Sequence, residues 1–256
     1  MTGRVMVVAA HPDDAEFSFG ATVARLTDEG TEVVYVVCTD GSLGGSNPRP
    51  SADDVSAVRY AEQRAAAAAL GVHDVVFLGF RDGELTADVA LRRAVTRQIR
   101  RWRPGIVLTH WPQRSLTFPI GASHPDHFAA GEAVLSAIYP DARNPRAYPD
   151  LLADGLEPHV VEEAWLPGLR EPNHFVDVSR YADRKIEAIL QHKSQFTEHS
   201  DPVASLGWVR DRMRHNGSYV GCDYAEAYVR IQTGSNAGAG PPPAPADSAA
   251  AHSLRW

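Results

Sequence analysis

Apolar segments of strand length alternate with segments of helical periodicity through the first 140 residues of the chain. The run at residues 4–10, Arg-Val-Met-Val-Val-Ala-Ala, is almost continuously apolar, as in strands that a parallel sheet buries on both faces. The same alternation predicts further strands at residues 31–39, 74–80 and 105–110, and helices at 16–29, 54–70, 87–102 and 124–138. The expected fold class is therefore α/β, with a mostly parallel sheet and helices on both of its faces.

The pattern is weaker after residue 140. A connection rich in Pro and Asp is expected first, and it is followed by short strands, a helix, and a last helix or strand. The connection is expected at residues 139–156 and the short strands at 160–166 and 175–178. The helix is expected at 181–196 and the last element at 219–232. From Thr233 onward Gly, Ala, Pro and Ser dominate, which predicts a disordered or extended tail. We expect a single domain over residues 1–232 and a tail over residues 233–256.

The composition limits the partners and the location of the protein. The formal net charge is −7 at pH 7, which argues against nucleic acid as a partner because phosphate binding requires a basic face. No apolar run approaches the roughly 20 residues that a membrane span needs, and the first strand follows Met1 without a signal-peptide segment. The expected location is the cytoplasm, where Cys38, inside an apolar strand, is expected to be a buried thiol rather than half of a disulfide.

Two short polar motifs stand at the ends of predicted elements. His-Pro-Asp-Asp at residues 11–14 directly follows the first strand, and His-Pro-Asp-His at residues 124–127 begins a predicted helix. Taken alone, the first motif is equally typical of a turn with an aspartate helix cap. However, ligands of parallel sheets bind beyond the carboxyl ends of the strands, so the two motifs are expected to meet at that edge. His124 and His127 are three residues apart across a helix start, so both side chains can point to one side.

Together the two motifs offer His, Asp and His as metal ligands, with a further carboxylate and a further imidazole nearby. A catalytic zinc site has three protein ligands and an open position for water, whereas a structural zinc site is closed by four ligands. Two imidazoles and one carboxylate would leave enough positive charge on zinc to bring the pKa of a bound water toward about 7. One Asp must then stay off the metal as the base, and one His must stay off it to act on the other side of the reacting carbon.

The segment Ala-His-Pro-Asp-Asp-Ala-Glu at residues 10–16, together with Ser-His-Pro-Asp-His at residues 123–127, resembles the LmbE-like (PIG-L) family of zinc-dependent N-acetylglucosaminyl de-N-acetylases. The resemblance extends from about residue 4 to residue 232 and implies a Rossmann-like fold without a dinucleotide site. It also implies one Zn²⁺ per chain. The residues that the resemblance assigns to zinc are His11, Asp14 and His127. It further implies that Asp13 is the general base and that His124 acts on the developing oxyanion or the leaving amine.

Other positions match the family more loosely. Arg59 and Asp82 resemble residues on the substrate side of the family's site, although a solvated helix arginine and a simple Asp-Gly turn are the alternatives. The family's commonest motif has Glu directly after the two aspartates, whereas here Ala15 intervenes, so no role is assigned to Glu16. A packing role is favoured for His110 at the end of the fourth strand, and a structural role for the segment at residues 192–196.

The resemblance implies a hydrolase that removes the N-acetyl group from an N-acetylglucosaminyl-type small molecule. Two alternatives remain: an amidase that acts on a larger sugar-thiol conjugate, and a non-catalytic sugar-binding protein on the same scaffold. The sequence does not identify the group that carries the amine, and it leaves a homo-oligomer open. Fe²⁺ or Co²⁺ would tolerate the same ligands as zinc.

Overall fold

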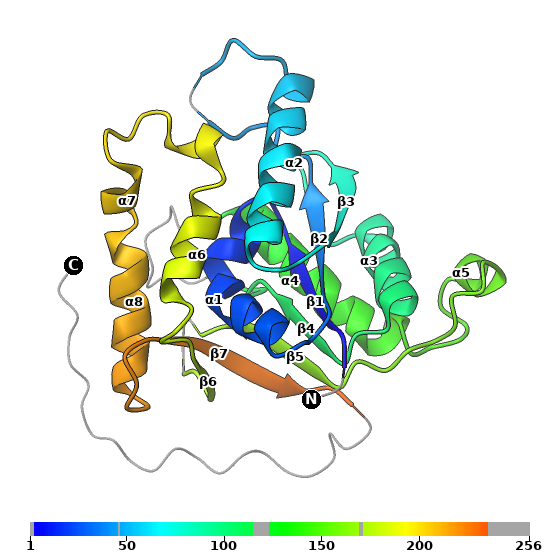
Figure 1. The fold of residues 1–256 in the computed structure, drawn as a ribbon. Helices are drawn as coiled ribbons and strands as arrows, with labels where there is room; N and C mark the ends of the chain where they lie inside the picture. The colour runs from blue at the N-terminus through cyan, green and yellow to red at the C-terminus, as the bar shows by residue number, and fades with distance from the viewer. Residues whose placement is uncertain (1–2, 46, 115–122, 169–170, 235–256) are drawn as a thin grey trace.

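The computed structural model describes residues 3–45, 47–114, 123–168 and 171–234 (Figure 1). Its centre is a seven-stranded sheet with the strand order β3-β2-β1-β4-β5-β7-β6. Neighbouring strands from β3 to β5 are parallel, and β7 is antiparallel to both β5 and β6. The strands are β1 (Val5–Ala9), β2 (Val33–Thr39), β3 (Asp74–Phe80), β4 (Ile106–Thr109), β5 (Glu163–Pro167), β6 (His174–Asp177) and β7 (Ala225–Gln232). The prediction of a mostly parallel α/β fold is confirmed.

Helices cover both faces of the sheet. One face packs against α1 (Asp14–Asp28), α2 (Ala52–Ala69) and α6 (Ala182–Ile189), and the other against α3 (Val89–Trp102) and α4 (Pro125–Ser136). Because successive strand residues point to opposite faces, Val5 and Val7 of β1 join the first core and Met6 and Val8 join the second. This two-sided burial explains why the first apolar run has no polar alternation.

A third layer lies outside the first face. There α8 (Gly207–Ser218) packs through Val209 and Met213 against α6, and Figure 1 shows α6 between α1 and α8. Sequence reasoning missed both α8 and the short helix α7 (Pro202–Ser205) before it. The buried residues of α8 are few, namely Val209, Met213 and Gly217, so the segment has little apolar periodicity from which to predict a helix.

Two other expectations need correction, and a third is decided between its two alternatives. The helix predicted at residues 181–196 ends at Ile189, because the apolar stripe stops there, and a 3₁₀ turn, η3 (Lys193–Phe196), follows. The segment predicted as a connection, residues 139–156, contains most of an irregular turn, η2 (Ala137–Asp141), whose backbone is not helical at Tyr139, and the short helix α5 (Pro149–Ala153). The last segment, predicted as a helix or a strand, forms β7. Most of the predicted tail, from residue 235 onward, lies outside the described residues.

The connection after β3 creates a crevice in the sheet. The chain builds β1, β2 and β3 outward in one direction and then returns to place β4 on the other side of β1. At such a reversal the helices leave the sheet on opposite faces, which opens a site at the carboxyl ends of the two central strands. The motif at residues 11–14 follows β1, and His110 follows β4, so both stand at this position.

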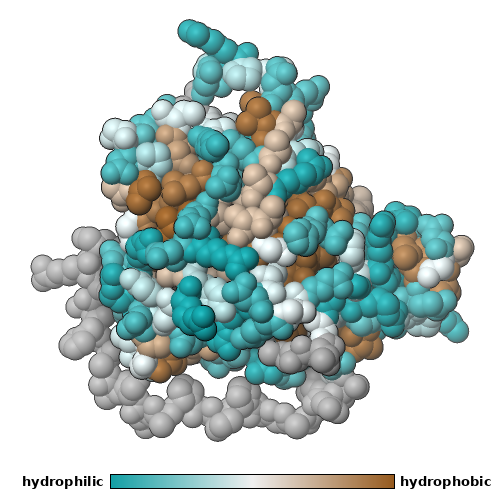
Figure 2. Space-filling view, viewed as in Figure 1, coloured by the Kyte–Doolittle hydropathy of each residue, from teal (hydrophilic) through white to brown (hydrophobic). Residues whose placement is uncertain are grey.

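The surface carries the charged residues that the composition requires. Figure 2 shows mostly hydrophilic residues on the visible face, with the apolar residues in separate patches rather than in one continuous band. Within the described part of the chain, no helix combines the length and the apolar character needed to cross a membrane. Cys38 is buried and Cys222 is partly buried, and both are free thiols, as expected.

Candidate active site

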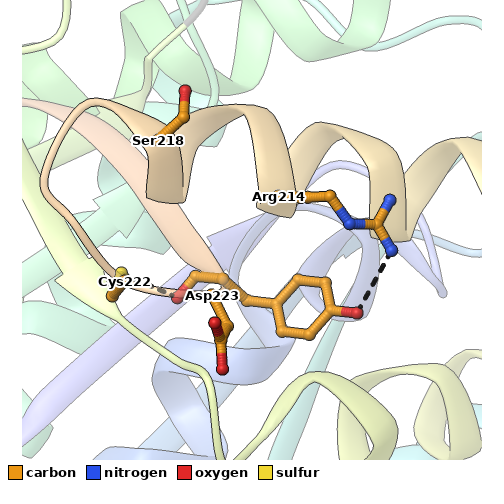
Figure 3. Close-up of a pocket in the computed structure, with 5 residues that line it drawn as sticks. Arg214, Ser218, Cys222 and Asp223 are labelled. Carbon is orange, nitrogen blue, oxygen red and sulfur yellow. Dashed lines mark hydrogen bonds between the residues drawn. The ribbon is translucent and has the colours of Figure 1, made fainter.

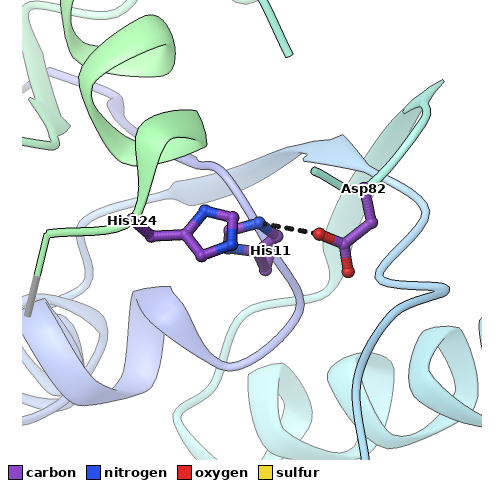
Figure 4. Close-up of side chains that lie close together, drawn as sticks. All are labelled: His11, Asp82 and His124. Atoms are coloured by element: carbon purple, nitrogen blue, oxygen red, sulfur yellow. Dashed lines mark ion pairs between the residues drawn. The ribbon is translucent and has the colours of Figure 1, made fainter. Parts of the chain in front are cut away.

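His11 is the centre of a cluster that three segments assemble. Its Nδ1 lies 3.2 Å from Asp14 Oδ2, while its Nε2 lies 3.1 Å from Asp82 Oδ1 and 3.2 Å from Asp126 Oδ2. Asp14 begins α1, Asp82 lies in the turn after β3, and Asp126 is in the first turn of α4. Figure 4 shows His11 and His124 close together, with Asp82 directed at His11. The two motifs therefore meet at the carboxyl edge of the sheet, as the sequence predicted.

Two groups among the described residues could hold a metal ion. One is His11, Asp14 and His127, and the other is His11, Asp82 and His124; in each, the ligand atoms lie within 4.8 Å of one another. The first group is the ligand set expected from the sequence. Its two histidines lie on either side of Asp14, because His127 Nε2 is 3.0 Å from Asp14 Oδ1. Two imidazoles and one carboxylate suit a catalytic divalent ion.

The environment of Asp126 favours the first group. Asp126 is fully buried and accepts hydrogen bonds from the Gly83 N–H at 2.8 Å and the Leu85 N–H at 3.3 Å. A metal-ligating histidine usually donates its other ring N–H to a carboxylate that fixes the ring. Asp126 could fill that place for His11 through Nε2, which would leave Nδ1 on the side of Asp14. Asp126 was not singled out from the sequence, although it lies inside the second motif.

The cluster is built to stabilise positive charge. Burial alone would lower the pKa of His11, but hydrogen bonds with Asp126, Asp14 and Asp82 outweigh it and raise the pKa to about 12. Burial also opposes ionisation of Asp14, yet the neighbouring His127 and a hydrogen bond with His11 hold its pKa well below the usual range. The carboxylates thus favour a cation at their centre, and a metal ion would have to displace protons from the histidines.

Asp13 has an unusual backbone that leaves its side chain free. It is the residue before α1, yet its φ is 103° and its carboxylate makes no helix-capping hydrogen bond. Its Oδ2 instead accepts a hydrogen bond from Arg59 at 3.0 Å. Burial raises the pKa of Asp13 to about 6, against the opposing effect of Arg59. A carboxylate with a pKa near neutral, next to the ligands but outside the metal group, is suited to take a proton.

His124 is held in one tautomer by the start of α4. Its Nδ1 accepts a hydrogen bond from the Asp126 N–H at 3.3 Å, so the neutral ring carries its proton on Nε2. Burial and the positive charge of His11 lower the pKa of His124. The ring meets that of His11 edge-on, with centroids 4.5 Å apart. A neutral N–H donor beside the ligands can stabilise a developing oxyanion.

Arg59 and Asp82 are both held by the protein itself. Arg59 is 4% exposed, and its guanidinium donates to the carbonyl oxygens of Gly41 and Pro12. Asp82 is also 4% exposed and accepts from the Leu43 N–H at 3.1 Å. A Cβ at Gly41, where φ is +66°, would lie 2.9 Å from Arg59, so glycine lets this loop close over the guanidinium. Contacts of Arg59 and Asp82 with a substrate remain predictions.

His110 belongs to the cluster as well. Its Nε2 accepts the Ala10 N–H at 2.9 Å and lies 3.5 Å from Asp14 Oδ2, and its ring stacks on His127 with centroids 4.3 Å apart. Burial lowers the pKa of His110 to about 4, so the ring is neutral. The packing role favoured from the sequence therefore places His110 against two of the expected ligands. Its position after β4, at the reversal of strand order, was the available signal.

A second hollow lies away from this cluster. It has a volume of about 370 Å³ at the turn between α8 and β7, and its lining includes Arg214, Cys222 and Tyr224 (Figure 3). The Arg214 guanidinium donates to the Tyr224 hydroxyl at 3.3 Å. No residue of the cluster around His11 contributes to its wall. This hollow is therefore separate from the cluster at the sheet edge.

The chain is similar in sequence and structure to proteins named as deacetylases. Residues 6–138, which include both motifs, match the model of the PIG-L family, described as GlcNAc-PI de-N-acetylase. Diacetylchitobiose deacetylase of Thermococcus kodakarensis is 37% identical over 199 residues, covering 76% of this chain and 71% of that protein. The 1D-myo-inositol 2-acetamido-2-deoxy-alpha-D-glucopyranoside deacetylase of Actinosynnema mirum is 31% identical over 240 residues, covering 80% of this chain and 85% of that protein.

A solved structure extends the similarity to the fold. The N,N'-diacetylchitobiose deacetylase of Pyrococcus horikoshii, solved with an inhibitor, superposes with a TM-score of 0.82 at 28% identity. The match covers 90% of this chain and 84% of that one. It therefore includes strands and helices well beyond the region of the family model.

Proposed function

The chain belongs to the PIG-L family of de-N-acetylases, and from this premise we propose that it hydrolyses the acetamide of an N-acetylglucosamine-type small molecule with one zinc ion. One observation carries the proposal. Asp13, whose carboxylate makes no capping hydrogen bond and lies outside both metal groups, directly precedes Asp14 of the set His11, Asp14 and His127, and this supports the proposal. Such an arrangement is suited to hydrolysis by a metal-activated water, with the aspartate outside the metal group as the base. Fe²⁺ or Co²⁺ could occupy the same ligands.

The residues divide the work of amide hydrolysis. When bound, zinc supplies a Lewis acid that polarises the acetamide carbonyl and lowers the pKa of water. Asp13 accepts a proton from the water as its oxygen bonds to the carbonyl carbon. His124 presents its Nε2–H to the oxyanion or the leaving nitrogen. The carbon–nitrogen bond then breaks, the nitrogen takes up a proton, and acetate and a free amine are released.

The substrate side is proposed from chemistry and from the relatives. The relatives named above act on diacetylchitobiose and on an inositol-linked 2-acetamido sugar, which share the acetamido sugar and differ in the attached group. We propose that Asp82, which contacts His11, and Arg59, which contacts Asp13, also contact the sugar in this chain. The cytoplasm is the expected compartment for such a small-molecule hydrolase, without nucleic acid as a partner. A homo-oligomer remains open.

Amine release tests the proposal. The protein is stripped of metal, reloaded with zinc, and offered N-acetylglucosamine, diacetylchitobiose, an N-acetylglucosaminyl inositol and larger sugar-thiol amides. We expect zinc-dependent release of a primary amine from at least one of the first three, with none from the stripped protein. Release only from larger sugar-thiol amides would favour the amidase alternative. A protein that holds one zinc and releases no amine from any of these compounds would favour the sugar-binding alternative.

A further inference from the structure

We infer that Gln63 is a positioning residue that holds Asp13 in its left-handed backbone, and so keeps the carboxylate of Asp13 at the site. The inference rests on the proposed function, because it deepens the role of Asp13 as the base. It concerns a buried chain of hydrogen bonds that links α2 to the loop before α1. Besides Asp13, this chain of hydrogen bonds consists of Gln63, Glu16 and His192. None of these three residues belongs to either group that could hold a metal ion.

The backbone of Asp13 is what requires support. A helix-capping residue normally has extended backbone angles, and its side chain then accepts a hydrogen bond from the first turn of the helix. Asp13 instead has a φ of 103°, and its carboxylate makes no such bond. In this conformation the Asp13 carboxylate does not cap α1 and is available as a proton acceptor. A left-handed backbone at a residue other than glycine costs free energy and persists only where its surroundings enforce it.

Gln63 supplies the enforcing contact. The Asp13 N–H donates to Gln63 Oε1 at 2.8 Å, and Gln63 Nε2 donates to Glu16 Oε1 at 2.9 Å. The other carboxylate oxygen of Glu16 lies 3.2 Å from His192 Nε2. Gln63, Glu16 and His192 are all fully buried. Burying a carboxylate, an amide and an imidazole is costly unless their hydrogen bonds are made, so this chain fixes its members in one arrangement.

The direction of the Gln63 amide follows from its partners. Its NH₂ must face Glu16, which offers oxygen atoms only, so its carbonyl must face Asp13. Four residues earlier on α2, Arg59 donates to the Asp13 carboxylate and to the Pro12 carbonyl. Residues four apart lie on the same face of a helix. Helix α2 therefore contacts the loop before α1 at two points. Gln63 binds the backbone of Asp13, and Arg59 binds its side chain.

The test replaces Gln63→Met, which keeps the length of the side chain and removes both hydrogen bonds. We expect kcat to fall about tenfold while KM changes less than about twofold, because the base is misplaced and substrate binding is not. Zinc content should stay at the wild-type level. The matched control is Gln98→Met on α3, which removes another buried glutamine that makes no contact with Asp13. It should keep the wild-type kcat.

A double-mutant cycle separates positioning from general damage. Asn tolerates a left-handed backbone, so Asp13→Asn removes the base while keeping the amide of the loop. If Gln63 acts through the carboxylate, Gln63→Met lowers the residual rate of the Asp13→Asn variant by less than about twofold. Equal losses in both backgrounds, or no loss in either, would overturn the inference. Should Gln63→Met not fold, the polar variant Gln63→Asn, one methylene shorter, takes its place in the same cycle.

Amide hydrogen exchange keeps the inference separate from the reaction itself. Gln63→Met should speed exchange at the peptide that contains the Asp13 amide, and Gln98→Met should leave it unchanged. If the wild-type protein releases no amine, the proposed function fails, and this exchange measurement still decides whether Gln63 holds the loop. Unchanged exchange at Asp13 in the Gln63→Met variant would overturn the inference whatever the activity.

Discussion

Asp13 and Asp14 are neighbours in the chain but face different partners. The carboxylate of Asp14 lies between His11 and His127, whereas that of Asp13 meets Arg59. The left-handed backbone of Asp13 is the reason, because it turns consecutive side chains toward different sides of the loop. The motif predicted that one aspartate would bind the metal and one would stay free. The motif could not show the hydrogen bonds that hold Asp13, since their partners Gln63 and Arg59 lie about fifty residues away in the chain.

Replacing the base should separate catalysis from metal binding. Asp13→Asn keeps the size of the side chain and removes the proton acceptor, so we expect kcat to fall by roughly 10²- to 10⁴-fold. Zinc measured by elemental analysis should stay at the wild-type amount per chain, because Asp13 lies outside the metal group. A rate close to that of the wild type would rule out Asp13 as the base.

The pH profile of the wild type reports the same group. Burial raises the pKa of Asp13 to about 6, and a base is active only when deprotonated, so activity is lost as the pH falls through that value. We expect kcat/KM to be level above about pH 7 and to fall about tenfold per pH unit well below pH 6. The residual activity of Asp13→Asn should lack this acid limb. A limb that persists in the variant would point to another group.

At the scale of elements, a buried ion pair joins α6 to β7. Lys185 Nζ lies 2.5 Å from Glu226 Oε1, and both side chains are nearly inaccessible to solvent. Glu226 also accepts the Thr22 N–H of α1 at 2.8 Å and the Tyr228 hydroxyl at 2.8 Å. This pair explains how the first face of the sheet keeps α1 and α6 together. Its members are separated by 41 residues, and nothing in the local sequence of either predicts the contact.

Breaking this pair should destabilise the fold without touching the site. Lys185→Met keeps the aliphatic stem but leaves Glu226 as a buried charge without its cation, so we expect a loss of about 3 kcal/mol in the free energy of unfolding. The control is Arg214→Met, which removes exposed contacts with Asp211 and Tyr224 and should change the free energy of unfolding much less than Lys185→Met does. Urea unfolding measures both. Equal effects of the two variants would contradict a stabilising role for the buried pair.

At the scale of the whole molecule, the topology brings the site together. The strand order reverses between β1 and β4, and residues that are more than 110 positions apart meet at that crevice. The apolar alternation of the first half predicted this arrangement because the central strands β1, β2 and β4 are buried on both faces and each helix is amphipathic or small-residue rich. The outer layer was not predicted, since α8 buries only one narrow side against α6. The position of His110 after β4 was visible in the sequence, but its hydrogen bond with the Ala10 N–H, just after β1, forms only in the assembled sheet.

We propose that a single metal ion is held by His11, Asp14 and His127, with His124 outside its coordination. The zinc content of His127→Ala and His124→Ala, purified and reloaded in parallel, tests it most directly, because the two groups that could hold a metal share His11 and differ in these histidines. We expect His127→Ala to lose most of its zinc and His124→Ala to keep about one zinc per chain while losing activity. Zinc retained by His127→Ala and lost by His124→Ala would contradict the account and move the metal to the group with Asp82.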